Sequence, residues 1–143
     1  MHPLLRNSLA VVAGILLGSL VNMGLILLGG TLLPPPPGVD VNDVASINAH
    51  IGEYSVAQMM VPFLAHALGT LIGAFTTARI AASWKLTLAL TIGVFFLLGG
   101  VMAARMIPDG PLWFTALDLG VAYLPMAWLG HRLATGKSGI HRT

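Results

Sequence analysis

Residues 8–33 read SLAVVAGILLGSLVNMGLILLGGTLL, a run without a charged side chain. A bilayer core about 30 Å thick is crossed by about 20 mainly apolar residues in a helix that rises about 1.5 Å per residue. The run is long enough to span a membrane, and the block Pro34 to Pro37 ends it, because proline cannot continue a helix. Since it exceeds the apolar segment of a cleavable signal peptide, we predict a helix that stays in the membrane.

The composition of the whole chain agrees with a membrane protein. Of 143 residues, seven are Lys or Arg, five are Asp or Glu, and 56% are hydrophobic. A soluble domain usually has about a quarter of its residues charged, because its surface must be solvated. The low charge excludes a soluble domain, the high hydrophobicity excludes a disordered chain, and the absence of cysteine excludes a disulfide scaffold.

Four long apolar runs predict an all-α, polytopic integral membrane protein, with a single four-helix domain over residues 1–143. The predicted spans cover residues 8–33, 55–82, 84–107 and 112–134, and Pro62 and Pro125 mark kinks in the second and fourth. Residues 34–54 form an outer, periplasmic loop, and residues 135–143 form a cytoplasmic tail. Within the loop we expect a short helix, capped by Asp40 and beginning near Val41, that lies on the outer interface or covers the mouth of the bundle.

The positions of the basic residues predict the orientation. One side of the membrane receives Arg6, Arg79, Lys85, Arg132, Lys137 and Arg142, whereas Asp40, Asp43, Glu53 and Asp109 fall on the other side, with Arg105 near its boundary. Short cytoplasmic segments retain Lys and Arg. We therefore predict a protein of the bacterial inner membrane with both termini in the cytoplasm.

Small residues recur at helical spacing and predict close helix packing. Within lipid, hydrophobic burial does not draw helices together, so association depends on close contact at small residues and on polar contacts. The positions expected to pack are Gly14 and Gly18 in the first span, Gly69 and Gly73 in the second, and Gly93 in the third. They could join helices within one bundle or between protomers, and the sequence leaves both arrangements open.

Among the polar residues of the predicted spans, four stand out: Asn22, His66, Arg105 and Asp118. A charged group at the centre of a membrane helix costs about 2.5 to 3.5 kcal/mol on insertion scales, so each needs a partner or a function. The rise per residue brings all four to the outer half of the bundle. One interpretation, which we favour, is a structural cluster with a neutralised Asp118–Arg105 pair. The other is a proton or solute site in which Asp118 exchanges a proton and His66 relays it.

The sequence contains little that indicates catalysis. Asp43, His50 and Glu53 share the outer loop, but no second pair with ligand spacing accompanies them, so we predict no metal site. We also expect no cofactor, no catalytic residue, and no nucleotide or nucleic-acid partner, because the hydrophilic segments are small and the basic residues mark topology.

Two functions follow as expectations. The leading one is a non-enzymatic accessory, scaffold or lipid-interacting component, in contact with membrane lipid and with copies of itself or other membrane subunits. The alternative is a small transporter or channel-like oligomer with a site at Asp118 and His66. A closed, dry bundle would favour the scaffold, a polar cavity that reaches these residues would favour the transporter, and a lipid-accessible cleft ending at His66 would favour an intramembrane enzyme.

Overall fold

The computed structural model describes residues 2–136, and all the regular structure in that range is helical. The elements are α1 (Pro3–Leu32), α2 (Val44–Ala49), the 3-10 turn η1 (Ile51–Glu53), α3 (Val56–Ile80), α4 (Lys85–Met106), α5 (Leu112–Val121) and α6 (Leu124–Thr135). Four stretches are long and apolar enough to cross a membrane: α1, α3, α4 and the combined stretch Leu112–Thr135. The prediction of an all-helical fold with four such stretches is confirmed. Lys137 and Arg142 of the predicted tail lie outside the described residues.

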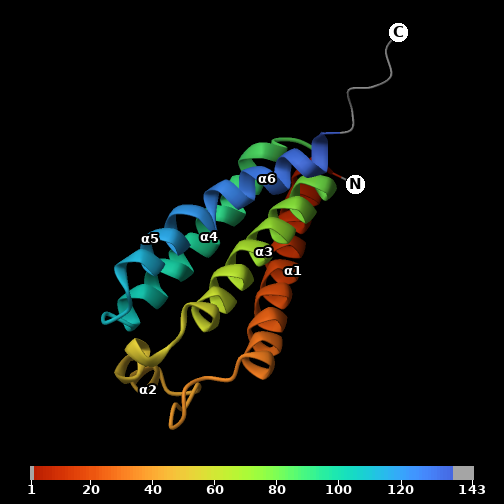
Figure 1. The fold of residues 1–143 in the computed structure, drawn as a ribbon. Helices are drawn as coiled ribbons and strands as arrows, with labels where there is room; N and C mark the ends of the chain where they lie inside the picture. The colour runs from red at the N-terminus through yellow and green to blue at the C-terminus, as the bar shows by residue number, and fades with distance from the viewer. Residues whose placement is uncertain (1, 137–143) are drawn as a thin grey trace.

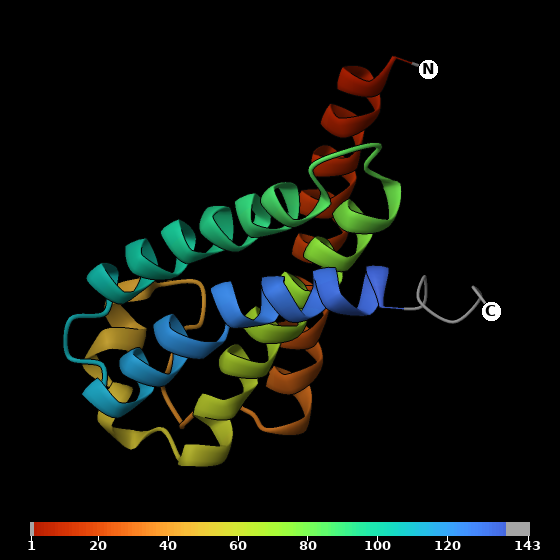
Figure 2. The same ribbon diagram turned by 90° about the horizontal axis from the view of Figure 1, so that it is seen from above.

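Helix α3 lies at the centre of the bundle and contacts each of the other long helices (Figures 1 and 2). Its neighbours are α1 on one side and α4 and α6 on the other, and α1 packs chiefly on α3. The start of α1 and the end of α6 lie at one end of the bundle, whereas α2 lies at the opposite end (Figure 1). We call the first end the turn end, after the short turn between α3 and α4. We call the opposite end, where α2 lies, the cap end.

The contact between α1 and α3 is built on paired glycines. A Cβ atom added at Gly14 would lie 2.6 Å from the carbonyl oxygen of Gly73, and one added at Gly18 would lie 2.7 Å from that of Gly69. Backbone therefore meets backbone, and Thr77 adds a hydrogen bond from its hydroxyl to the Ala10 carbonyl at 3.2 Å. We call this contact the glycine seam. It lies within one chain.

Gly93 is also at a helix contact. A Cβ atom there would come within 2.7 Å of the Ala127 Cβ, so this glycine lets α4 approach α6. All five glycines that the sequence indicated for packing thus lie between helices of the same chain.

Asn7 closes the turn end. Its side-chain oxygen accepts hydrogen bonds from the backbone of Ala82 (2.9 Å) and Ser83 (3.3 Å), and its amide nitrogen donates to the Ser83 hydroxyl (3.0 Å). Trp84 follows with a positive φ of 51°, a backbone conformation that few side chains other than glycine adopt readily. The asparagine holds a tight turn that would otherwise leave backbone N–H groups without partners.

The short helix predicted in the loop is present as α2, but Asp43 caps it rather than Asp40. The Asp43 carboxylate accepts a hydrogen bond from the Ala45 N–H at 3.0 Å. Asp40 instead accepts from the Asn42 N–H at 2.9 Å, in a turn closed by a backbone bond from Asp43 to Asp40. Because residues 40–43 form this turn, the helix begins at Val44 and not near Val41.

A reciprocal pair of hydrogen bonds holds α2 over the cap end. The Asn48 amide donates to the Asp109 carboxylate at 2.7 Å, and the Asp109 N–H donates to the Asn48 side-chain oxygen at 3.2 Å. Asp109 lies in the loop between α4 and α5, so the pair, which we call the latch, joins segments far apart in the sequence. Gln58 fixes the other side of the loop by donating to the Pro34 carbonyl.

The fourth predicted span is two helices rather than one. Helix α5 ends at Val121 and α6 begins at Leu124, with Ala122 and Tyr123 between them. Pro125 has no N–H to bond the Val121 carbonyl, and in a continuous helix its ring would clash with that carbonyl. The proline instead occupies the first turn of α6, where it is tolerated. By contrast, α3 continues as a helix through Pro62.

Candidate functional site

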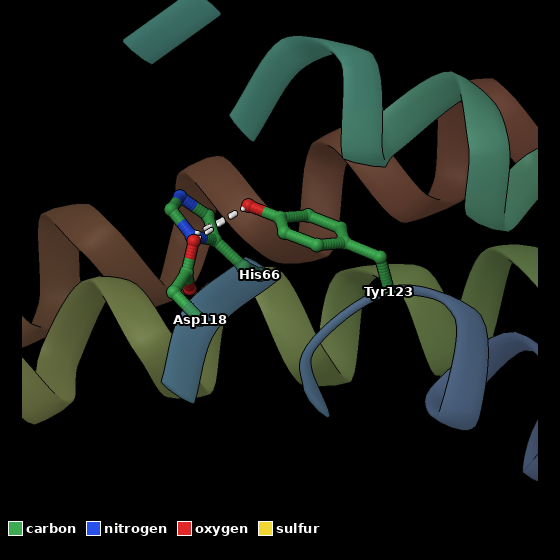
Figure 3. A network of polar contacts seen from close by, with 3 residues as sticks. All are labelled: His66, Asp118 and Tyr123. Carbon is green, nitrogen blue, oxygen red and sulfur yellow. Dashed lines mark hydrogen bonds and ion pairs between the residues drawn. The ribbon is translucent and has the colours of Figure 1, made fainter. Parts of the chain in front are cut away.

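Three side chains from three segments meet at the interruption of the fourth span (Figure 3). The His66 Nδ1 of α3 lies 2.8 Å from Oδ1 of Asp118 in α5, and the Tyr123 hydroxyl donates to Oδ2 of the same carboxylate at 2.9 Å. The hydroxyl oxygen is also 3.1 Å from the His66 Nδ1. Both carboxylate oxygens of Asp118 therefore have a partner.

The network determines which face of the imidazole is available. An ionised carboxylate only accepts hydrogen bonds, so with Asp118 in that form the proton between the two groups is on the His66 Nδ1. The other ring nitrogen, Nε2, points away from Asp118 and Tyr123 (Figure 3). It has no hydrogen-bond partner among residues 2–136. In the neutral ring Nε2 has a free lone pair and can accept a hydrogen bond from a ligand.

Burial makes this network costly to disrupt. Asp118 is 4% exposed and Tyr123 is 2% exposed, whereas His66 is partly exposed. A buried polar group without a partner costs about 1 to 3 kcal/mol. The helix interruption makes the arrangement possible, because the backbone at Tyr123 departs from helical geometry (φ −115°, ψ −80°) just where the ring turns toward Asp118.

The structure brings three of the four predicted polar residues to one place. His66 and Asp118 are bonded directly, and Asn22 of α1 lines a small cavity together with His66. Arg105 is different, since it is exposed, lines neither cavity described below, and forms no ion pair or hydrogen bond with any residue in the described range.

The expected Asp118–Arg105 pair is therefore absent, and Tyr123 occupies the place assigned to the arginine. The physical reason is the position of Arg105 in the last turn of α4, on the surface of the bundle, where its guanidinium can be solvated. Asp118 instead faces the interior, within reach of the His66 ring and the Tyr123 hydroxyl. These two partners, rather than the Arg105 guanidinium, stabilise the carboxylate.

A cavity of about 370 Å³ runs from beneath α2 and η1 to this network. The cap contributes Val41, Ile47, Ile51 and Tyr54, and burial raises the pKa of the Tyr54 phenol, which stays neutral at physiological pH. The remaining lining is mostly apolar: Ile26, Gly30, Leu33, Pro35, Gln58, Met59, Val61, Pro62, His66, Gly100, Ala103, Ala104, Ile107, Gly110, Pro111, Phe114, Thr115, Asp118 and Leu119. We call it the chain cavity.

A second cavity of about 210 Å³ adjoins the first at His66, Gly100 and Ala103. Asn22, Thr70, Phe96, Gly99 and Tyr123 complete its lining. The Asn22 Oδ1 and the Thr70 Oγ1 are buried without a hydrogen-bond partner in the described part of the chain, and Thr70 is fully buried. We call it the polar chamber.

The outer loop shows no metal site among the described residues. No group of three His, Cys, Asp or Glu side chains in residues 2–136 is arranged to hold a metal ion. Asp43 caps α2, and His50 bonds the Ser46 carbonyl at 2.8 Å. Two of the three candidate ligands in this loop, Asp43 and His50, therefore have structural partners.

Tyr123 is the site residue that sequence reasoning missed. Its hydroxyl reaches the Asp118 carboxylate from the middle of the predicted fourth span, where a tyrosine carries no formal charge to draw attention to it. A signal was present, because Pro125 two positions later predicts a local departure from helix. In an unbroken helix, however, a residue five positions after Asp118 lies about 140° around the axis from it, so spacing alone did not place Tyr123 beside the carboxylate.

No family model matches the chain, and neither the curated proteins nor the solved structures contain a match to it. The function is therefore inferred from the geometry of the site.

Proposed function

We propose that this chain is a non-enzymatic, lipid-interacting protein of the bacterial inner membrane that binds an amphiphilic molecule in the chain cavity. The observation that carries the proposal is the cavity itself, whose lining is apolar over most of its length and ends at a buried polar network. Ligand sites commonly have volumes of about 300 to 1,000 Å³ with a few placed polar groups, and this cavity is of that kind.

The distribution of charge supports a membrane orientation with the turn end in the cytoplasm. Arg6 donates to the Ile80 carbonyl and Arg79 to the Ala134 carbonyl, so both basic residues belong to the turn end. Asp109 belongs to the cap end through the latch. In this orientation the cap and the mouth of the chain cavity face the periplasm, and both termini face the cytoplasm.

The outward surface of α1 supports contact with lipid. Leu16, Leu20 and Leu27 are exposed along this helix, and no charged residue lies between them. The glycines of the glycine seam, by comparison, contact other helices of the same chain, so they are not available as the basis for self-association. Membrane lipid is accordingly the partner that we propose for this surface.

A small transporter remains the second candidate, on one specific observation. The fourth span is interrupted at Ala122 and Tyr123, next to Asp118, and interrupted helices form substrate sites in many transporters. The apolar lining of the chain cavity favours an amphiphile over a hydrated ion as the molecule bound. If transport occurs, we expect Asp118→Asn to abolish it while the protein still inserts.

Binding can be tested by photocrosslinking in lipid nanodiscs with a long-chain alcohol that carries a diazirine at mid-chain. We expect crosslinks at Met59 and Phe114 in the cavity to exceed those at Leu16 and Leu20 on the surface of α1. Gly30→Phe should remove the cavity crosslinks, because Gly30 lines the cavity and has no atom within 4 Å of its added Cβ.

Gly24→Phe is the matched control. Gly24 lies on the same helix and is equally open, but it does not line the cavity. Equal crosslinking of the cavity and the α1 surface in the unmodified protein would reject the proposed function.

A further inference from the structure

The polar chamber differs from an ordinary packing defect in what lines it. A void left by imperfect packing is apolar and stays dry, whereas this one contains the unpartnered Oδ1 of Asn22 and Oγ1 of Thr70. Buried polar atoms in native proteins almost always have a partner, and an exception needs an explanation. Thr70 is fully buried, so no solvent at the protein surface supplies the missing partner.

His66 stands between the two cavities, because its ring lines both. Asp118 and Tyr123 occupy its Nδ1, and its Nε2 remains available. A ligand whose chain fills the chain cavity would thus end beside Nε2, Asn22 and Thr70. We propose that the polar chamber is the head-group subsite for the amphiphile of the proposed function, on which this inference rests, and that the head group is an uncharged hydroxyl.

The charge of the lining supports an uncharged head group. Within the described residues, no Lys or Arg lines either cavity, so a phosphate or carboxylate would have no counter-ion and would approach the Asp118 carboxylate. An ammonium group in the polar chamber would likewise have no counter-ion, because no Asp or Glu among the described residues lines that chamber. A charge transferred to such a site without a partner would be costly.

The hydrogen-bonding groups select a hydroxyl among uncharged heads. The Asn22 Oδ1 accepts, the Thr70 hydroxyl both accepts and donates, and the His66 Nε2 accepts when the ring is neutral. A ligand hydroxyl can donate to one of the acceptors and accept from Thr70. An ether or an ester has no proton to donate, so it would leave the acceptors unsatisfied.

Specificity must come from this subsite because the membrane removes the usual contribution of the chain. An acyl chain that leaves lipid for an apolar cavity exchanges one apolar environment for another, so its burial gains little. The hydrogen bonds at the head group then decide which amphiphile binds. One net hydrogen bond corresponds to about a three- to tenfold difference in affinity.

The test uses the diazirine alcohol described above, its methyl ether and the carboxylic acid of the same chain, each in nanodiscs with the full chain. We expect the alcohol to crosslink Met59 and Phe114 about three- to tenfold more than the ether or the acid. Thr70→Val should bring the alcohol and the ether to nearly equal yields, because it removes the hydroxyl and retains the shape. Thr77→Val, another fully buried threonine of α3 outside both cavities, should keep the preference.

The possible failures are distinct. If the alcohol and the ether crosslink the cavity equally and Gly30→Phe removes both, amphiphile binding holds and the head-group subsite is wrong. A preference for the acid, or a preference for the alcohol that survives Thr70→Val, also overturns the hydroxyl subsite. If no probe crosslinks the cavity above the α1 surface, the proposed function itself fails.

Discussion

The two faces of α3 show how one helix can serve both packing and binding. Toward α1, Gly69 and Gly73 allow direct backbone contact in the glycine seam. Toward α5 and the helix interruption, His66 contacts Asp118 and Tyr123 beside two cavities. The seam lies along the middle of α1, and nearer the cap end the contact between the two helices passes to the Val61 side chain against Gly29. One face of α3 thus holds α1, while the other face borders the cavities.

Helix α1 follows the same division along its length. Every fourth residue from Ala10 to Gly18 lies in the seam, the next position is Asn22 in the polar chamber, and Ile26 and Gly30 line the chain cavity. One face of α1 therefore packs against α3 over its first half and lines the two cavities over its second half. The comparison predicts that substitutions along this face act on stability near the turn end and on binding near the cap end.

The largest effect is expected from Gly14→Leu in the seam. A Cβ atom at this position already meets the Gly73 carbonyl at 2.6 Å, so the larger side chain must force α1 and α3 apart. Overpacking typically costs about 1 to 3 kcal/mol, and contact with rigid backbone puts this change at the upper end. Thermal unfolding in detergent should show a large fall in Tm. Gly24→Leu, in open space on the same helix, should leave Tm unchanged. Equal Tm values for the two variants would show that the seam does not hold the helices.

A smaller loss of stability is expected from Asp118→Ala on the opposite face. The change leaves the His66 Nδ1 and the Tyr123 hydroxyl without their acceptor, at a cost of about 1 to 3 kcal/mol. Tyr123→Phe should cost about 1 kcal/mol, because it removes the hydroxyl that bonds Asp118 and contacts the His66 Nδ1 but retains the ring. Unfolding of both single variants and of the double variant would give the coupling between them. Additive losses would mean that the tyrosine and the carboxylate do not interact.

Release of the cap by Asn48→Ala should cost about 0.5 to 1.5 kcal/mol locally, because it removes both hydrogen bonds of the latch. The chain has no cysteine, so a single introduced Ile51→Cys, which lies in the cavity lining, can be labelled alone. We expect a maleimide to react several times faster in the variant without the latch. An unchanged rate would show that the latch does not hold α2 over the cavity. Asn42→Ala offers a control, because that side chain is not part of the latch.

The smallest effect is expected from Arg105→Gln. Since this side chain is exposed and lies outside both cavities, stability should change by less than about 0.5 kcal/mol. Thermal unfolding of this variant beside Asp118→Ala checks the assignment of Tyr123 in place of Arg105. A loss of stability as large as that of Asp118→Ala would show that Arg105 interacts with the network after all.

The sequence was sufficient for the elements that depend on local pattern. Apolar run length predicts the helices, and the four-residue spacing of Gly14 and Gly18 identifies the face of α1 that meets α3. The depth of a residue along a helix also predicts that His66 and Asp118 lie at a common level. These properties follow from helix geometry alone.

What the sequence could not supply depends on direction around the helix axis and on tertiary contact. The same depth argument placed Arg105 with Asp118, although the two side chains face different surroundings. Tyr123 reaches the carboxylate only because the backbone is interrupted, and the cap position of α2 requires a contact between Asn48 and a distant loop. Neither relation appears in local spacing.

The latch has a consequence for rates. Asn48 and Asp109 do not line the chain cavity, so the latch should contribute little to the difference in free energy between the bound and free forms once the cap is closed. It instead adds to the barrier for entry and to the barrier for exit by the same amount. Weakening it should speed association and dissociation equally and leave Kd unchanged, which makes the cap a control on residence time.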